Sequence, residues 1–198
     1  GAMLRIMYVA LGGLRWDWRP MFWVIAILTM FVGVIIALTQ TDVKRMLAYS
    51  SVAHAGFLLI AVIATNEQGL GGAMFYLLAY GVATIGAFGV VSLVRDSTGE
   101  ATHLSSWAGL GKRSPWVAGA FTVFLLSFAG IPLTAGFIGK FAVFEAGVAG
   151  GAGWLVVAAV LASAIAVFFY GRVIVIMFFT EPQADGPTVV IPSSFTAI

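Results

Sequence analysis

The sequence predicts an all-α, polytopic transmembrane helix bundle with about five full spans, the end of a sixth, and one discontinuous span. Hydrophobic residues make up 61% of the 198 residues and charged residues only 9%, and the mean hydropathy is +1.05. These values lie far outside the range of soluble domains. The 24 glycines suit close helix contact in lipid, where small residues let backbones approach. We expect a single bundle over residues 1–198.

Five apolar segments are long enough to cross a hydrocarbon core of about 30 Å, and polar or charged turns separate them. The fourth segment is much longer than one crossing needs, and it contains Gly130 and Pro132. Because proline lacks an amide donor and its ring clashes with the carbonyl four residues back, we expect a broken helix near 130–132. The expected spans are residues 21–39, 46–65, 70–94, 115–144 and 154–179.

The two ends of the chain are too short to span a membrane. Residues 1–14 are apolar apart from Arg5 and are interpreted as the end of another span. Residues 180–198 contain proline and glycine and are expected to form a cytoplasmic tail or a linker to a missing helix. Both ends look cut, so we expect the chain to be part of a larger membrane protein.

The distribution of basic residues predicts the orientation of the bundle. If five spans alternate, one side carries more lysine and arginine, and that side should be cytoplasmic. The opposite side then carries only Arg15 and Arg19 between spans. The richer side holds the Lys44/Arg45 and Lys112/Arg113 loops together with Arg95.

Composition also excludes several kinds of chemistry. With no cysteine, the chain has no thiolate-ligated iron–sulfur cluster or cysteine-based zinc site, and its two histidines argue against a bis-histidine haem. We expect no redox centre, metal site or cofactor site in this chain. The net charge of +2 comes from basic residues that act as topology signals in short loops, so nucleic-acid binding is not expected.

Lys140 is the residue that most needs an explanation, because it lies inside a mostly apolar segment. A lone ammonium in hydrocarbon costs about 3 kcal/mol, so it should face a protein interior or a water-filled path and could exchange protons. The alternative is that its four methylenes carry the nitrogen to an interface. Glu145, five residues on, is either an exit carboxylate or a residue that ends the span in water.

His54 is expected about 14 Å into its helix, near the middle of the bilayer. Ser50 and Ser51 precede it by four and three residues, so both can share its face and offer hydrogen bonds or order a water. A helix–helix hydrogen bond and a proton relay both fit this pattern. At the start of the same helix, Lys44 is interpreted as an interfacial anchor, or as a contact with a neighbouring subunit or a gate.

Three segments together resemble a known family. Residues 40–51, followed by 53–56, are similar to a segment shared by the antiporter-like subunits of respiratory complex I and the Mrp-type cation/proton antiporters. Residues 104–111 and 127–141 are most similar to subunit N of bacterial proton-translocating NADH:quinone oxidoreductases.

The resemblance implies a place in the fold and roles for three residues. The spans would be the ninth to thirteenth of fourteen helices, with a broken twelfth. Lys140, His54 and Lys44 match residues of the family's proton path and would act as relay residues. The family's fifth-helix glutamate and its seventh- and eighth-helix lysines would precede this chain, so the segment alone should not pump.

The implied function is proton translocation driven by electron transfer from NADH to quinone in other subunits, within an enzyme complex of the bacterial inner membrane. NADH, FMN, iron–sulfur clusters and quinone would be bound by partner subunits. The partners would be other membrane subunits, especially neighbouring antiporter-like ones. Alternatives are a subunit of an Mrp-type antiporter or of a membrane-bound hydrogenase and, in a different class, a purely structural membrane scaffold.

Overall fold

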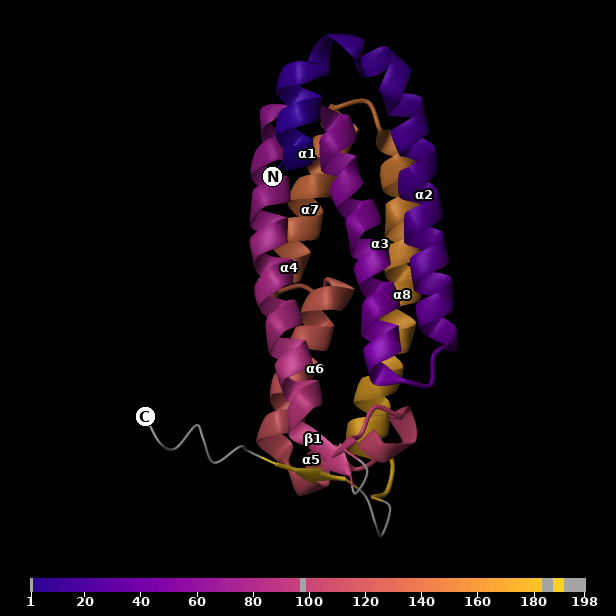
Figure 1. The fold of residues 1–198 in the computed structure, drawn as a ribbon, viewed down its shortest axis with the longest axis vertical. Helices are drawn as coiled ribbons and strands as arrows, with labels where there is room; N and C mark the ends of the chain where they lie inside the picture. Colours follow the sequence, from indigo (N-terminus) through magenta and orange to yellow (C-terminus); the bar gives the residue numbers. More distant parts are fainter. Residues whose placement is uncertain (1, 97–98, 183–186, 191–198) are drawn as a thin grey trace, which may run out of the picture.

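The protein is an elongated helix bundle in a computed structural model that describes residues 2–96, 99–182 and 187–190 (Figure 1). The chain opens with α1 (Ala2–Arg5), a π-helical turn η1 (Ile6–Ala10) and a 3₁₀ turn η2 (Gly12–Leu14). The long helices are α2 (Arg15–Thr39), α3 (Val43–Ala64), α4 (Glu67–Leu93) and α8 (Gly153–Phe179). The remaining elements are β1 (Val94–Asp96), β2 (Gly99–Glu100), η3 (Leu104–Trp107), α5 (Leu110–Arg113), α6 (Pro115–Ala129), α7 (Ala135–Ala149) and β3 (Thr188–Val189).

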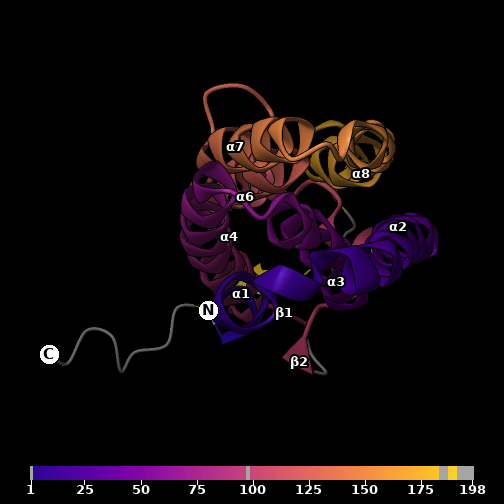
Figure 2. The ribbon, with the colours of Figure 1, turned by 90° about the horizontal axis from the view of Figure 1, so that it is seen from above.

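Helix α3 is the central element. It packs against α2, α4, α7 and α8, and Figure 2 shows it between α2 and α4 and facing α7 and α8. The most apolar 18-residue stretch of α3 is 61% buried, whereas the corresponding stretches of residues 12–39, α4 and α8 are 28–39% buried. The outer helices therefore keep an apolar face for lipid or other subunits, while α3 supplies much of the shared core.

Within the described residues, four helical segments are long and apolar enough to cross a membrane: residues 12–39, α3, α4 and α8. Each overlaps one of the expected spans, and α3 and α4 end one residue before the spans expected at 46–65 and 70–94. The remaining crossing, the fourth along the chain, is divided between α6 and α7, which have 15 residues each and are therefore about 22 Å long, too short to cross alone. They lie one above the other along the bundle axis (Figure 1). The predicted all-α bundle with one discontinuous span is confirmed.

Local chemistry explains the break. Gly130 ends α6 with a φ of +77°, a left-handed conformation that glycine adopts without a Cβ penalty. Its amide donates to the carbonyls of Leu126 and Ser127, and the Ile131 amide donates to Leu126. Pro132 follows without a donor, and the Thr134 hydroxyl then caps α7 by accepting from the Phe137 amide. At the break, the C-terminus of α6 and the N-terminus of α7 are therefore each capped by local hydrogen bonds.

One end of the bundle carries a small sheet that was not predicted from the sequence. Strand β1 pairs antiparallel with both β2 and β3, in the order β2-β1-β3. The Arg113 guanidinium supports β3 by donating to the Pro187 carbonyl at 2.9 Å. Part of the expected tail, residues 187–190, therefore folds back onto this end, whereas residues 183–186 and 191–198 of that tail lie outside the described residues.

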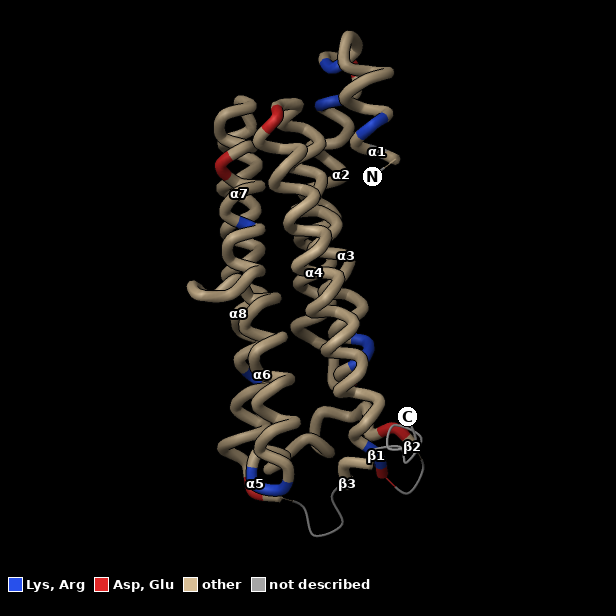
Figure 3. Tube along the Cα trace, turned by 90° about the vertical axis from the view of Figure 1, so that its left-hand side faces the viewer, with Lys and Arg blue, Asp and Glu red and all other residues tan. Residues whose placement is uncertain are grey.

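The loop before α3 is tied to the same end. Asp42 and His103 form an isolated antiparallel bridge, and the Asp42 side chain caps α3 by accepting from the Arg45 amide at 2.9 Å. Burial raises the pKa of the Asp42 carboxyl, but hydrogen bonds from Thr102 and from the Arg45 amide outweigh it, so the pKa lies below its ordinary value. Figure 3 shows that most charged residues gather toward the two ends of the bundle.

Candidate functional site

Lys140 lies in the second half of the broken span and points into the bundle. Its side chain is only 4% exposed. The ammonium donates to the carbonyls of Phe128 and Ala129 at 2.8 and 3.1 Å and to the Ser163 hydroxyl at 2.9 Å. The predicted inward orientation is therefore confirmed, and the alternative of a lysine that reaches an interface is excluded.

The charge of Lys140 is stabilised by the end of helix α6. Carbonyls in the last turn of a helix lack intrahelical donors and carry the negative end of the helix dipole. Phe128 and Ala129 provide two such carbonyls, and the Phe57 ring lies 4.9 Å from the Lys140 nitrogen as a cation–π partner. Among the described residues, the partners of Lys140 include no carboxylate. The helix break therefore creates the site that holds the ammonium.

Two glycines allow the half-helices to approach at this site. A Cβ on Gly136 would lie 1.8 Å from the Ser127 carbonyl oxygen, so the first turn of α7 rests directly on the last turn of α6. A Cβ on Gly130 would lie 2.9 Å from the Lys140 side chain. Larger residues at either position would displace the groups that contact the ammonium.

A second buried polar group surrounds His54 on α3. Its Nδ1 lies 2.5 Å from the Tyr76 hydroxyl on α4, and its Nε2 lies 3.3 Å from the Tyr170 hydroxyl on α8. The Tyr170 hydroxyl also forms a hydrogen bond with Ser50. The imidazole stacks on Tyr80 with a centroid distance of 4.4 Å. Ser50, Tyr170, His54 and Tyr76 thus form a continuous hydrogen-bonded chain across three helices, and we call it the histidine chain.

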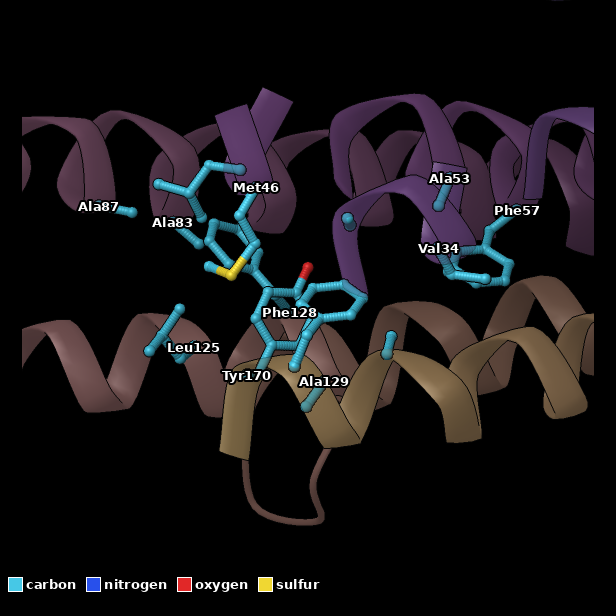
Figure 4. Close-up of a cluster of buried hydrophobic side chains, with 14 of the residues drawn as sticks. Val34, Met46, Ala53, Phe57, Ala83, Ala87, Leu125, Phe128, Ala129 and Tyr170 are labelled. Carbon is cyan, nitrogen blue, oxygen red and sulfur yellow. The ribbon is translucent and has the colours of Figure 1, made fainter. Parts of the chain in front are cut away.

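Two phenylalanines lie between the histidine chain and Lys140. The rings of Phe57 and Phe128 lie 5.6 and 5.8 Å from the His54 ring, while Lys140 contacts the Phe57 ring and the Phe128 carbonyl. Phe128 and Tyr170 lie together in the buried cluster of Figure 4, with ring centroids 5.9 Å apart. No hydrogen bond joins Lys140 to His54 in the described part of the chain, so the two groups are neighbours with an apolar separation.

Three other predicted residues lie outside these groups. The Ser51 hydroxyl bonds to the Leu47 carbonyl of its own helix at 2.9 Å instead of reaching the histidine chain. Glu145 is exposed on α7 and is not among the hydrogen-bond partners of Lys140. Lys44 lies in the first turn of α3 and forms an ion pair with Glu100, and both side chains remain about one-third exposed. The predicted relay residues Lys140 and His54 and the possible supporting residue Ser50 are therefore buried, whereas Lys44, Ser51 and Glu145 are not.

Three residues of these groups were not predicted from the sequence: Tyr76, Tyr170 and Ser163. Both tyrosines lie inside predicted spans, and a buried hydroxyl needs a hydrogen-bond partner. Their positions could therefore have indicated a buried polar group. Ser163 offered a weaker one, because serine is common where membrane helices pack closely. The described residues contain no cluster of three or more histidine, aspartate or glutamate side chains able to hold a metal ion. The lysine amine, the imidazole and the hydroxyls of these two groups can each donate or accept hydrogen bonds, and the amine and imidazole can bind a proton.

Comparison with known proteins identifies the family. Residues 1–166 match the transmembrane family model described as NADH:quinone oxidoreductase/Mrp antiporter. The chain belongs to this NADH:quinone oxidoreductase/Mrp antiporter family. It is 68% identical over 197 residues to NADH-quinone oxidoreductase subunit N of Rhodococcus opacus (strain B4), covering 100% of this chain and 36% of that relative. The chain thus spans about a third of that relative's length.

Solved structures of two assemblies share the fold of this family member. A chain of respiratory complex I from Thermus thermophilus with bound Aureothin is 34% identical, with a TM-score of 0.78, over 90% of this chain and 40% of that chain. A chain of the Mrp complex from Dietzia sp. DQ12-45-1b is 28% identical, with a TM-score of 0.82, over 92% of this chain and 34% of that chain. The resemblance stated from residues 40–56, 104–111 and 127–141 is confirmed.

Proposed function

We propose that this chain is part of a membrane-arm subunit of NADH:quinone oxidoreductase that translocates protons, driven by electron transfer from NADH to quinone in other subunits. The observation that carries the proposal is Lys140, a buried ammonium that is held at a helix break by neutral oxygens. A structural lysine gains most from a carboxylate partner, whereas neutral acceptors leave the amine free to lose its proton. The 68% identity to a protein named subunit N favours this reading.

In this proposal Lys140 and His54 are relay residues on either side of Phe57 and Phe128. Water that enters between these rings, or a change of ring rotamer, would connect Lys140 with the histidine chain. Ser50 then leads toward Lys44, six residues earlier on α3 and paired with Glu100. Gly130 and Pro132 provide the helix break that holds Lys140 in place. Ser51 and Glu145 have no direct role in the proposed relay.

The redox chemistry of the complex would take place in partner subunits, which would bind NADH, FMN, iron–sulfur clusters and quinone. Neighbouring antiporter-like subunits would cover part of the apolar surface. The end that carries the Lys44/Arg45 and Lys112/Arg113 loops would face the cytoplasm across the inner membrane, because lysine and arginine favour that side.

An Mrp-type antiporter subunit is the second candidate, and the similarity to the Dietzia Mrp complex supports it. Its 28% identity is much lower than the 68% identity to subunit N, which is why we place the chain in NADH:quinone oxidoreductase. A purely structural scaffold would need no buried ammonium, since burying a charge is costly and an apolar residue of similar size would pack as well.

The test replaces Lys140 in the full-length subunit within the assembled complex. We expect Lys140→Met to lower the protons pumped per NADH oxidised, because loss of a positioned acid–base group slows proton transfer through this subunit by about a hundredfold or more. Lys112→Met makes the same chemical change at an exposed position and should pump normally. Proton uptake into vesicles is measured alongside NADH:quinone activity and assembly on native gels. Normal pumping by an assembled Lys140→Met complex would refute the relay.

A further inference from the structure

We infer that Ser163 is a positioning residue for Lys140 that accepts a hydrogen bond from the ammonium and donates one to the neutral amine. This inference rests on the proposed function and adds a residue to the same site. Ser163 lies on α8, so it connects the broken span to a helix that is continuous.

The three oxygens around the Lys140 nitrogen are not equivalent. The carbonyls of Phe128 and Ala129 can only accept hydrogen bonds, whereas a hydroxyl both donates and accepts. The Ser163 hydroxyl accepts from Lys140 at 2.9 Å and lies 3.4 Å from the Ala129 carbonyl, to which it donates. When Lys140 loses a proton, this hydroxyl can rotate from Ala129 to the lone pair of the amine. Ser163 is therefore the side chain in the site that can pair with both forms of the lysine.

Ser163 also lies where the site opens. A groove of about 320 Å³ runs between α7, α8 and the helix break. Its lining is otherwise apolar or glycine, for example Phe141 and Val167, and the polar side chains in it are those of Lys140 and Ser163. Lys140 is 4% exposed, while Ser163 is only partly buried. A water in this groove would meet the Ser163 hydroxyl beside the lysine nitrogen.

The titratable groups around Lys140 are few. His54 of α3, Tyr76 of α4 and Tyr170 of α8 are buried on the helices that pack against α7, and α6 carries no charged residue. Glu67, Glu145 and Arg172 are exposed on α4, α7 and α8. The pH dependence of proton transfer at Lys140 should thus depend on its oxygen partners and on the histidine chain.

The test compares Ser163→Ala, Ser163→Thr and Thr122→Ala in the full-length subunit of the assembled complex, with proton pumping per NADH measured as a function of pH. Hydrogen bonds to an ammonium are about twice as strong as neutral ones, so loss of the hydroxyl removes more stabilisation from the protonated form. We expect Ser163→Ala to move the midpoint of the pumping profile about half a unit to one unit toward lower pH. Ser163→Thr keeps the hydroxyl and should restore the profile. Thr122→Ala removes a hydroxyl that only bonds to the Ala118 carbonyl of its own helix and should leave the profile unchanged.

An unchanged profile in Ser163→Ala, or equal shifts in Ser163→Ala and Ser163→Thr, overturns the inference. If Ser163→Ala does not assemble, Ser163→Cys replaces it, because a thiol has similar size but bonds weakly; a shift in the same direction supports the role and a wild-type profile overturns it. The Ser163 experiment and the Lys140 experiment can fail independently of each other. Loss of pumping in Lys140→Met with no shift in the Ser163 variants rejects only the role of Ser163.

Discussion

The substitution Gly136→Ala should open the junction between the two half-helices. A Cβ at this position would lie 1.8 Å from the Ser127 carbonyl oxygen, and real Cβ atoms essentially never approach closer than 3.0 Å, so the two turns must separate by about 1.2 Å. The same movement along the hydrogen bonds of Lys140 would stretch its 2.8 and 3.1 Å contacts with Phe128 and Ala129 to about 4 Å, beyond hydrogen-bonding distance. Each such charge-assisted bond contributes about 1.5–3 kcal/mol, so we expect a loss of about 3–6 kcal/mol.

The assay compares Gly136→Ala with Gly119→Ala in the assembled complex. A Cβ on Gly119, in α6, meets no atom within 4 Å, so this alanine should be neutral or stabilising by up to about 1 kcal/mol. We expect Gly136→Ala to lower both the temperature of thermal inactivation and the protons pumped per NADH. We expect Gly119→Ala to lower neither. If Gly136→Ala assembles, inactivates at the wild-type temperature and pumps normally, the tight junction does not hold Lys140 in place.

Three further outcomes are expected. Tyr76→Phe leaves the Nδ1 of His54 without its partner and should destabilise the complex by about 1–3 kcal/mol and reduce pumping; wild-type values for both would rule out a functional histidine chain. Glu100→Gln removes a partly exposed ion pair with Lys44 and should change thermal stability by less than about 1 kcal/mol. Because the folded-state pKa of Asp42 is depressed, its stabilisation should be complete above the ordinary value of about 4 and decline as pH falls through the lower folded-state value. Asp42→Asn should remove this acid-dependent part of the thermal stability profile.

The elements predicted from sequence are those that depend on local physics. Long apolar segments must form helices in lipid because no water satisfies their backbone groups. Gly130 in a left-handed conformation, followed by Pro132 without an amide donor, favours a helix end at this position. The small sheet was missed because strands of two or three residues carry little local signal, and because the pairing of β1 with β3 joins residues more than ninety positions apart. Helical spacing allowed both serines to share the face of His54, but tertiary packing determines their partners. Ser50 forms a hydrogen bond with Tyr170 of α8, whereas the Ser51 hydroxyl donates to the Leu47 carbonyl of its own helix.

The partners of Lys140 fit its proposed role as a proton relay. A carboxylate beside a buried lysine would form a strong ion pair, and removing the proton would then leave an unpaired buried anion, at a cost of several kcal/mol. Helix-end carbonyls stabilise the ammonium through the same dipole that favours cations at any helix terminus, but they remain neutral when the proton leaves. A continuous helix has no such carbonyls at mid-span, because each would accept from the amide four residues on. The break in the fourth span therefore supplies oxygens that can hold a charge inside the bundle without fixing it there.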